Sequence, residues 1–161
     1  MVLWVFGYGS LIWKAGFHYD DRLIGFIKGY HRVFYQGSTD HRGTPEYPGR
    51  TVTLEPCDGE VCWGVAYKVS GEEDEQIALT YLEVREKQYD MQEPDASTPA
   101  VSGILVQIVH AEGPSGPNRD YVFQLEKALL KLGCEDKHVM ELAETVRQKL
   151  SGRELTNSQV E

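Results

Sequence analysis

The feature that most constrains the fold is an apolar run at the start of the chain that ends in a glycine-rich turn. Residues 2–6 read Val-Leu-Trp-Val-Phe, and this β-branched and aromatic content predicts a strand buried on both faces. Gly7 and Gly9 flank Tyr8, so the backbone can turn sharply there and approach a neighbouring group closely. Amides at the end of such a strand can converge into a small anion-binding concavity. Ser10 adds a hydroxyl that can donate or accept a hydrogen bond.

Three interpretations of this turn compete. The first is a plain strand followed by a turn without a ligand. The second is the dinucleotide-binding pattern G-x-G-x-x-G, which fails because Ile12 stands at the third glycine position and no helical pattern follows. The third is a nucleophilic Ser10, but the pattern G-x-S-x-G would need glycines where Tyr8 and Ile12 stand. The residues alone therefore leave a plain turn and a binding loop open.

Length and charge narrow the function. The 161 residues suffice for one domain with a hydrophobic core, and we expect that domain to cover 1–150, followed by a polar tail at 151–161. The formal net charge of −9 argues against a nucleic-acid partner and a polybasic membrane-binding surface, but not against a small anionic substrate. Apolar runs stay well below the ~20 residues that a membrane span needs.

The N-terminus and the cysteines predict the compartment. No basic segment precedes the first apolar run, so a secretory signal is not expected. Cys57, Cys62 and Cys134 are odd in number and form no C-x-x-C motif, which predicts reduced thiols in a cytoplasmic protein. A zinc site would need a tighter cluster of Cys and His, so we expect no metal.

The pattern of the remaining chain predicts a mixed α+β domain. Strands are expected at 23–35, 51–55, 61–69 and 101–110, with a hairpin turn at 56–60. Apolar residues on both sides of the last strand predict a central or closed-barrel position. Helices are expected to begin at Ser70 and include Glu86, to run from 117 to 132, and to run from an Asp136 cap to Leu150.

A long polar connection at 36–50 contains several glycines and prolines, as functional loops often do. Its ionisable segment Asp40-His41-Arg42 fits a solvated loop tip, an internal ion pair or the wall of a site. A hydrolase triad of Ser10, His41 and Asp40 is a further alternative, which only a structure can test. Arg42 and Arg50 can each bind a substrate carboxylate as a planar fork.

Glu86 is the candidate general base. It follows Leu79 and Leu82 by seven and four residues, which places it on the expected core-directed face of a helix. Partial burial and the negative helix C-terminus would raise its pKa, as a base near neutral pH requires, although the adjacent cations oppose this. A purely structural pairing of Glu86 is the alternative. The rival carboxylate, Glu83, falls on a different helix face.

Several blocks of sequence resemble one family. The segment 6–13, Phe-Gly-Tyr-Gly-Ser-Leu-Ile-Trp, is similar to the N-terminal signature of the ChaC family, the glutathione-specific γ-glutamylcyclotransferases, and the chain as a whole is similar to the plant members. Further matching blocks lie at 36–43, 48–50, 62–67, 81–87 and 113–118. These blocks follow in order over about 2–150, so the resemblance covers the whole domain.

The resemblance implies a fold, a reaction and a site. The fold would be a small closed mixed β-barrel flanked by helices. The enzyme, a lyase without a cofactor, would cyclise the γ-glutamyl group of glutathione, its small-molecule substrate, to 5-oxoproline and release cysteinylglycine. Glu86 matches the family's catalytic glutamate, and the loop would bind the γ-glutamyl group. The candidate substrate-binding residues are Val5, Phe6, Gly7, Tyr8, Gly9, Ser10 and Leu11.

The chain departs from the family pattern after Glu86. Relatives carry more residues there, including a Tyr-Leu-Gly-Pro-Ala-Pro motif, whereas here Val109 runs almost directly into Gly113. The missing connection is expected to border the pocket. Two alternatives therefore stay open: a module that binds glutathione or 5-oxoproline without turnover, and a cyclotransferase for γ-glutamyl-amino acids. The block at 36–43, which resembles the glutathione-specific branch, argues against the second. Oligomeric state is not predicted.

Overall fold

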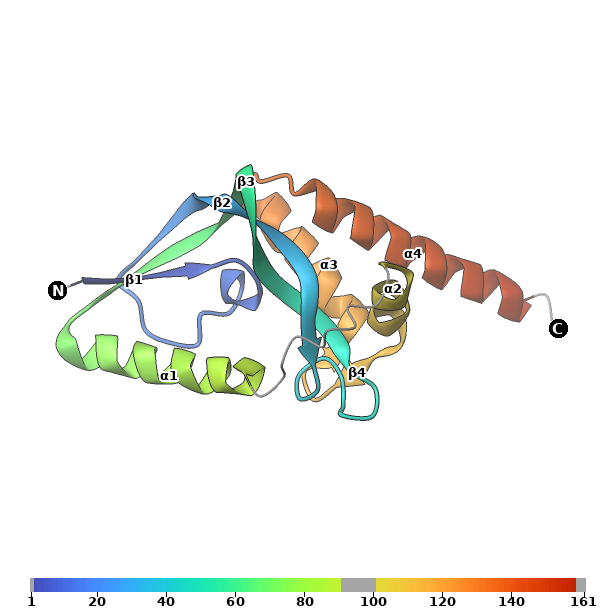
Figure 1. Cartoon of the computed structure of the whole chain (residues 1–161), viewed down its shortest axis with the longest axis horizontal. Helices are drawn as coiled ribbons and strands as arrows, with labels where there is room; N and C mark the ends of the chain where they lie inside the picture. Colours follow the sequence, from blue (N-terminus) through green and yellow to red (C-terminus); the bar gives the residue numbers. More distant parts are fainter. Residues whose placement is uncertain (1, 91–100, 159–161) are drawn as a thin grey trace.

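The computed structural model describes residues 2–90 and 101–158, and its described side chains leave out 85–90, 101–103 and 153–158. Three long antiparallel strands, β1 (Val2–Gly7), β2 (Asp21–Ser38) and β3 (Gly49–Ser70), form a sheet in the order β1-β3-β2. Figure 1 shows this sheet as a strongly twisted ribbon with α1 along one side and α2, α3 and α4 gathered at the other. The α+β class predicted from the sequence is confirmed.

The α-helices follow the three long strands in the chain, and a short 3₁₀ turn lies between β1 and β2. A 3₁₀ turn, η1 (Ser10–Ile12), comes directly after β1, and the α-helices are α1 (Glu72–Asp90), α2 (Val101–His110), α3 (Asn118–Lys131) and α4 (Lys137–Ser158). A short hairpin of β4 (Glu112–Gly113) and β5 (Gly116–Pro117) joins α2 to α3. The core lies between the sheet and the helices, and its fully buried members include Phe34, Val65, Tyr67, Ile108, Val122, Leu125, Val139 and Val146.

The predicted closed barrel is wrong for the described residues. A barrel requires its two outermost strands to pair with each other. Here β1 and β2 each pair with β3, so the sheet is open, with β1 and β2 at its edges. The prediction that β1 is buried on both faces is also wrong, because Val2 and Trp4, which share one face of the strand, are 48% and 49% exposed while Val5 on the other face is buried.

The predicted hairpin at 51–69 is one continuous strand. β3 pairs with β2 on both sides of the proposed turn, since Tyr30 lies opposite Pro56 and Lys28 opposite Val61. A single residue of β2, Gly29, therefore faces residues 57–60, which form a bulge. The turn-forming residues at 56–60 bend the strand without reversing it. The reversal occurs in the connection between β2 and β3, which is shorter than the predicted loop.

The predicted strand at 101–110 is the helix α2. Ile104 and Ile108 are buried at helical spacing, whereas Val106 between them is 50% exposed. Six of the ten residues in this segment are Val, Ile or Leu, and their order fits both strand alternation and helical periodicity. Packing against α3 and α4 decides the outcome.

The sequence signals at helix ends predict the helix boundaries better than periodicity predicts the type of element at 101–110. Asp136 caps α4 as predicted, because its Oδ1 accepts a hydrogen bond from the amide of Val139 at 3.2 Å. Gly133 ends the preceding helix with a φ of 75°. The last helix continues to Ser158, beyond the predicted end at Leu150. Within the described residues, no helix combines the length and apolar character needed to cross a membrane.

Candidate active site

A cavity of about 380 Å³ opens where β1 ends and η1 begins. Six of the seven candidate substrate-binding residues line it, namely Val5, Phe6, Tyr8, Gly9, Ser10 and Leu11. Gly7, the seventh, is buried and does not line the cavity, and a Cβ added to it would lie 2.8 Å from the Cβ of Leu11. The structure therefore brings the sequence-predicted loop around one hollow.

The turn that forms this hollow is tied to the core by backbone contacts. The amides of Ile12 and Lys14 donate to the carbonyls of Gly9 and Ser10, each at 2.9 Å. The buried Tyr67 hydroxyl of β3 donates to the carbonyl of Leu11 at 2.5 Å. These contacts hold the chain in one 3₁₀ turn, so the loop is preorganised.

Gly9 is required by close packing. A Cβ at this position would lie 2.7 Å from Cγ2 of Val52 and 3.0 Å from the hydroxyl of Tyr121. Both neighbours line the same cavity, Val52 from β3 and Tyr121 from α3. The predicted close approach of the backbone to a neighbouring group is therefore observed, and that neighbour is the opposite wall of the cavity.

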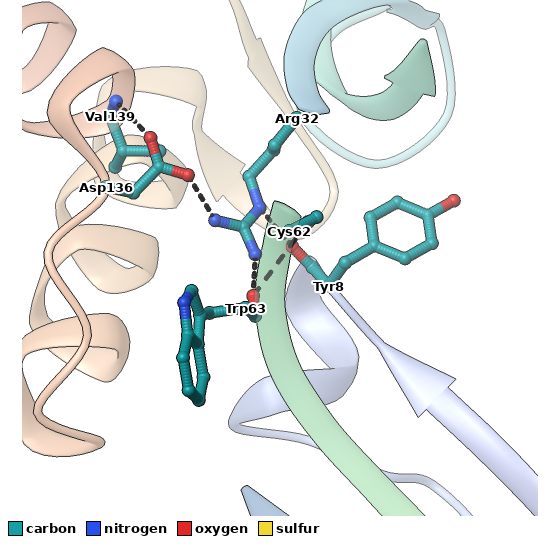
Figure 2. A network of polar contacts seen from close by, with 6 residues as sticks. All are labelled: Tyr8, Arg32, Cys62, Trp63, Asp136 and Val139. Atoms are coloured by element: carbon teal, nitrogen blue, oxygen red, sulfur yellow. Dashed lines mark hydrogen bonds and ion pairs between the residues drawn. The ribbon is translucent and has the colours of Figure 1, made fainter. Parts of the chain in front are cut away.

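A buried guanidinium supports the loop from behind. Figure 2 shows Arg32 of β2 between the loop, the sheet and the start of α4, with its side chain 0% exposed. Its Nε donates to the carbonyl of Tyr8 at 2.7 Å, and Nη2 donates to the carbonyl of Trp63. Nη1 pairs with the Asp136 carboxylate at 2.5 Å. One cation therefore ties the candidate binding loop to the N-terminus of the last helix.

A second cavity, of about 680 Å³, adjoins the first and shares Ser10 and Tyr121 with it. Its wall includes Lys14, His41 and Arg42. The guanidinium of Arg42 lies 5.7 Å from the centre of the Tyr121 ring, and burial lowers the pKa of Arg42. Two residues of the ionisable segment of the long loop, His41 and Arg42, thus contribute to the wall of a site, whereas Asp40 does not line it.

The structure argues against a hydrolase triad in this loop and gives Arg50 a structural role. Ser10 and His41 line the same second cavity, but Nε2 of His41 is 4.0 Å from Oδ1 of Asp40, longer than the hydrogen bond that orients a triad histidine. Arg50 makes internal contacts, with Nε donating to Oε1 of Gln107 at 2.6 Å and Nη1 donating to the carbonyl of Tyr35 at 2.8 Å. Arg50 therefore pins the loop.

Helix α1 forms a wall of both cavities. Leu82 lines the first cavity, and Tyr81 and Val84 line the second. Leu79 is 40% exposed, which corrects its prediction as an inward residue, and Ala78 is buried in its place. Glu86 comes one turn after Leu82 in α1, but its side chain lies outside the described part of the structure. Its role as a base stays a prediction.

The comparisons with known proteins decide the family. A family model described as ChaC-like protein matches residues 3–100 and 92–149. The chain belongs to the ChaC-like family. Over 96% of its length it is 56% identical to γ-glutamylcyclotransferase 2-3 of Arabidopsis thaliana, of which the alignment covers 93%. It is 40% identical to glutathione-specific γ-glutamylcyclotransferase 1 of Rattus norvegicus, covering 89% of this chain and 78% of the relative.

The fold of this ChaC-like protein agrees with a solved relative. A yeast γ-glutamylcyclotransferase specific to glutathione superposes with a TM-score of 0.79 and 28% identity, covering 91% of this chain and 96% of the other. The Arabidopsis alignment spans 185 positions, more than the 161 residues of this chain. That relative therefore carries residues without a counterpart here, and their place after Glu86 stays a prediction.

Sequence reasoning missed several walls of the first cavity. These come from β2, β3, α1 and α3, and they are Gln36, Val52, Thr53, Leu82 and Tyr121. Tyr121 fits the apolar face of a helix, which explains why its pattern predicts only a core residue. The ring of Tyr121 packs on Trp13 and Phe34, and Tyr121 also lines both cavities. No local signal distinguishes such a residue, because its role depends on strands that lie far away in the sequence.

Proposed function

We propose that this ChaC-like protein degrades glutathione by cyclising its γ-glutamyl group, which releases 5-oxoproline and cysteinylglycine. The observation that carries the proposal is the cavity around the Gly-Tyr-Gly-Ser turn. It occurs in a chain whose relatives from rat and Escherichia coli are named glutathione-specific γ-glutamylcyclotransferases. Its volume of about 380 Å³ is in the range of small-molecule sites.

The reaction is an intramolecular acyl transfer. The α-amine of the substrate attacks its own γ-carbonyl carbon, a C–N bond closes the five-membered ring, and the original amide C–N bond breaks. The proton lost by the α-amine is balanced by one gained by the departing amine of cysteine. Both reacting groups belong to one molecule, so the protein contributes mainly by holding the chain folded. This balance requires no cofactor.

The loop Val5–Leu11 would hold the γ-glutamyl group. Support comes from its position along the cavity and from its fixed backbone. Backbone amides of residues 9–11 would donate to a carboxylate of the substrate or to the developing oxyanion. Ser10 would add its hydroxyl to the same group.

Glu86 would move the protons. A carboxylate can accept a proton from the α-ammonium and return it to the leaving amine. Support comes from the resemblance of its sequence block to the family and from its position one turn after Leu82, which lines the cavity.

The test is an assay of both products from glutathione. We expect equal amounts of 5-oxoproline and cysteinylglycine from the native chain, and a loss of at least a hundredfold in kcat for Glu86→Gln, as removal of a general base gives. Glu83→Gln is the matched control, because Glu83 is exposed in the same helix and carries the same charge. Full turnover by Glu86→Gln would overturn the role of this glutamate. Absence of both products from the folded native chain would overturn the reaction.

A second candidate function is binding without turnover. It is favoured by the alignment, in which the Arabidopsis relative carries residues that this chain lacks. Under this alternative the chain binds glutathione or 5-oxoproline and releases no cysteinylglycine. Calorimetric titration of both molecules alongside the product assay distinguishes the two functions.

We further propose that residues 1–150 act as one domain in the cytoplasm, on a small molecule and not on nucleic acid. Support for the compartment comes from Cys57, Cys62 and Cys134, which are all free thiols in the structure. The net charge of −9 supports the absence of a nucleic-acid partner. Cell fractionation with an antibody against the chain tests the compartment, and recovery mainly in an organelle fraction would refute it.

A further inference from the structure

The second cavity is placed to receive one end of a ligand whose other end occupies the first. The two cavities share Ser10 and Tyr121, so these two residues lie at the boundary between them and a ligand that spans both would pass beside them. The second is also the larger, at about 680 Å³ against 380 Å³. If the γ-glutamyl group occupies the first cavity, the rest of the substrate has to leave it past these two residues.

The charge of the second cavity is opposite to that of the whole protein. The net charge of the chain is −9, yet Lys14, His41 and Arg42 line this cavity. Among the described residues that line it, none is a carboxylate. Two acids lie near these basic side chains without lining the cavity. Oδ1 of Asp40 lies 4.0 Å from Nε2 of His41, and Tyr121 and Asp120 raise the pKa of Arg42 against the larger lowering effect of burial.

Arg42 is held in place before any ligand arrives. Its residue is only 9% exposed, its Nη1 donates to the carbonyl of Pro117 at 3.3 Å, and its Nη2 donates to Oε1 of Gln124 at 3.2 Å. These contacts use two of the five N–H donors of the guanidinium. A fixed, partly satisfied guanidinium loses little freedom when it pairs with a carboxylate.

The wall also contains a polar atom that needs a partner. The hydroxyl of Thr51 is buried and makes no hydrogen bond within the described structure, although Thr51 lines the second cavity and is 5% exposed. Buried hydroxyls in native proteins are almost always hydrogen-bonded. An amide or a carboxylate of a ligand in this cavity could provide the missing partner.

We propose that the second cavity is the subsite for the leaving half of the substrate, the cysteinylglycine dipeptide, and that Arg42 and Lys14 select its terminal carboxylate. This inference rests on the proposed function. The glycine carboxylate is the one charged group in that half of glutathione. In a γ-glutamyl-amino acid the carboxylate lies one residue nearer the scissile bond, about 3.8 Å by the spacing of Cα atoms. The cations of this cavity would therefore favour the longer substrate.

The experiment compares glutathione with its C-terminal glycine carboxamide, which keeps the shape and removes the charge. We expect the native chain to prefer glutathione at least tenfold in kcat/KM. Lys14→Met and Arg42→Gln should lower kcat/KM for glutathione and leave kcat/KM for the carboxamide unchanged. The ratio of the two kcat/KM values should therefore fall toward one. Lys28→Met is the matched control, since it removes one exposed cation that lines neither cavity.

The outcomes separate this inference from the proposed function. Turnover of both compounds at equal kcat/KM, or an equal loss for both in the two variants, would overturn the carboxylate subsite and leave the cyclisation intact. Absence of turnover of either compound would overturn the proposed function. In that case calorimetric binding of the same two compounds decides the subsite, and equal dissociation constants would overturn it. Lys14 is exposed, so Lys14→Met should fold, and this variant alone tests the subsite if Arg42→Gln does not fold.

Discussion

The buried pair between Arg32 and Asp136 allows a quantitative prediction. The Arg32 side chain is 0% exposed and that of Asp136 is 23% exposed, so the charge of Arg32 depends on the carboxylate for compensation. Removing one partner of a buried ion pair costs about 3–5 kcal/mol, because the other charge stays buried and unpaired. Since water reaches Asp136, we expect Asp136→Asn to lower the free energy of unfolding by about 3 kcal/mol, the lower end of that range.

Three further variants isolate the pair. Asp136→Ala also removes the cap on the amide of Val139 and should lose about 1 kcal/mol more than Asp136→Asn. Arg32→Met removes the buried charge itself, so the double variant Arg32→Met/Asp136→Asn should be more stable than the sum of the single losses predicts. Arg147→Met is the control. It breaks an ion pair with Glu126 in which the Arg147 side chain is 46% exposed, and should lose less than about 1 kcal/mol.

The assay is urea unfolding followed by tryptophan fluorescence. With a slope of roughly 2 kcal/mol/M for a chain of this size, Asp136→Asn should shift the unfolding midpoint down by about 1.5 M. Because Arg32 also holds the carbonyl of Tyr8 in the candidate loop, the same variant should raise KM for glutathione. A loss below about 1 kcal/mol, or a double variant whose loss equals the sum of the singles, would refute the reasoning from burial.

Three other predictions concern separate features. Gly9→Ala should lower kcat/KM, and it should lower the free energy of unfolding by about 1–3 kcal/mol, because the added Cβ meets the cavity wall. Gly152→Ala is the control: an added Cβ there meets open space on a helix, so this variant should raise the free energy of unfolding by about 0.5–1 kcal/mol. Burial raises the pKa of the Cys62 thiol, so Cys62 should react with a thiol reagent only as the chain unfolds, and rapid modification of the native protein would contradict this. Hydrogen bonds from Ser70 lower the pKa of Asp20 below its ordinary 3.8, so its stabilising effect should be present at neutral pH and lost as the pH falls through that lowered pKa. Urea unfolding of Asp20→Asn should therefore show a loss at pH 7 that disappears in strong acid, and a loss of equal size at both would contradict the prediction.

The sequence by itself determined what depends on neighbours a few residues away. The strand that ends at Gly7, the cap at Asp136 and the end of a helix near residue 132 all follow from local backbone chemistry, and the structure contains each of them. The blocks that resemble one family also identified the ChaC-like family and placed the candidate loop at Val5–Leu11.

Tertiary structure alone decided what depends on distant partners. Residues 101–110 form a helix because α2 packs against α3 and α4 with Ile104 and Ile108 buried, and a local pattern that fits both strand and helix does not decide this. The local sequence around Arg32 predicts only a strand residue, yet its guanidinium pairs with the carboxylate of Asp136, 104 positions later in the chain. The opposite wall of the cavity, with Tyr121, is likewise absent from any local pattern. Periodicity and capping report forces within a few residues, whereas burial and ion pairing report the packing of elements that the chain brings together only when it folds.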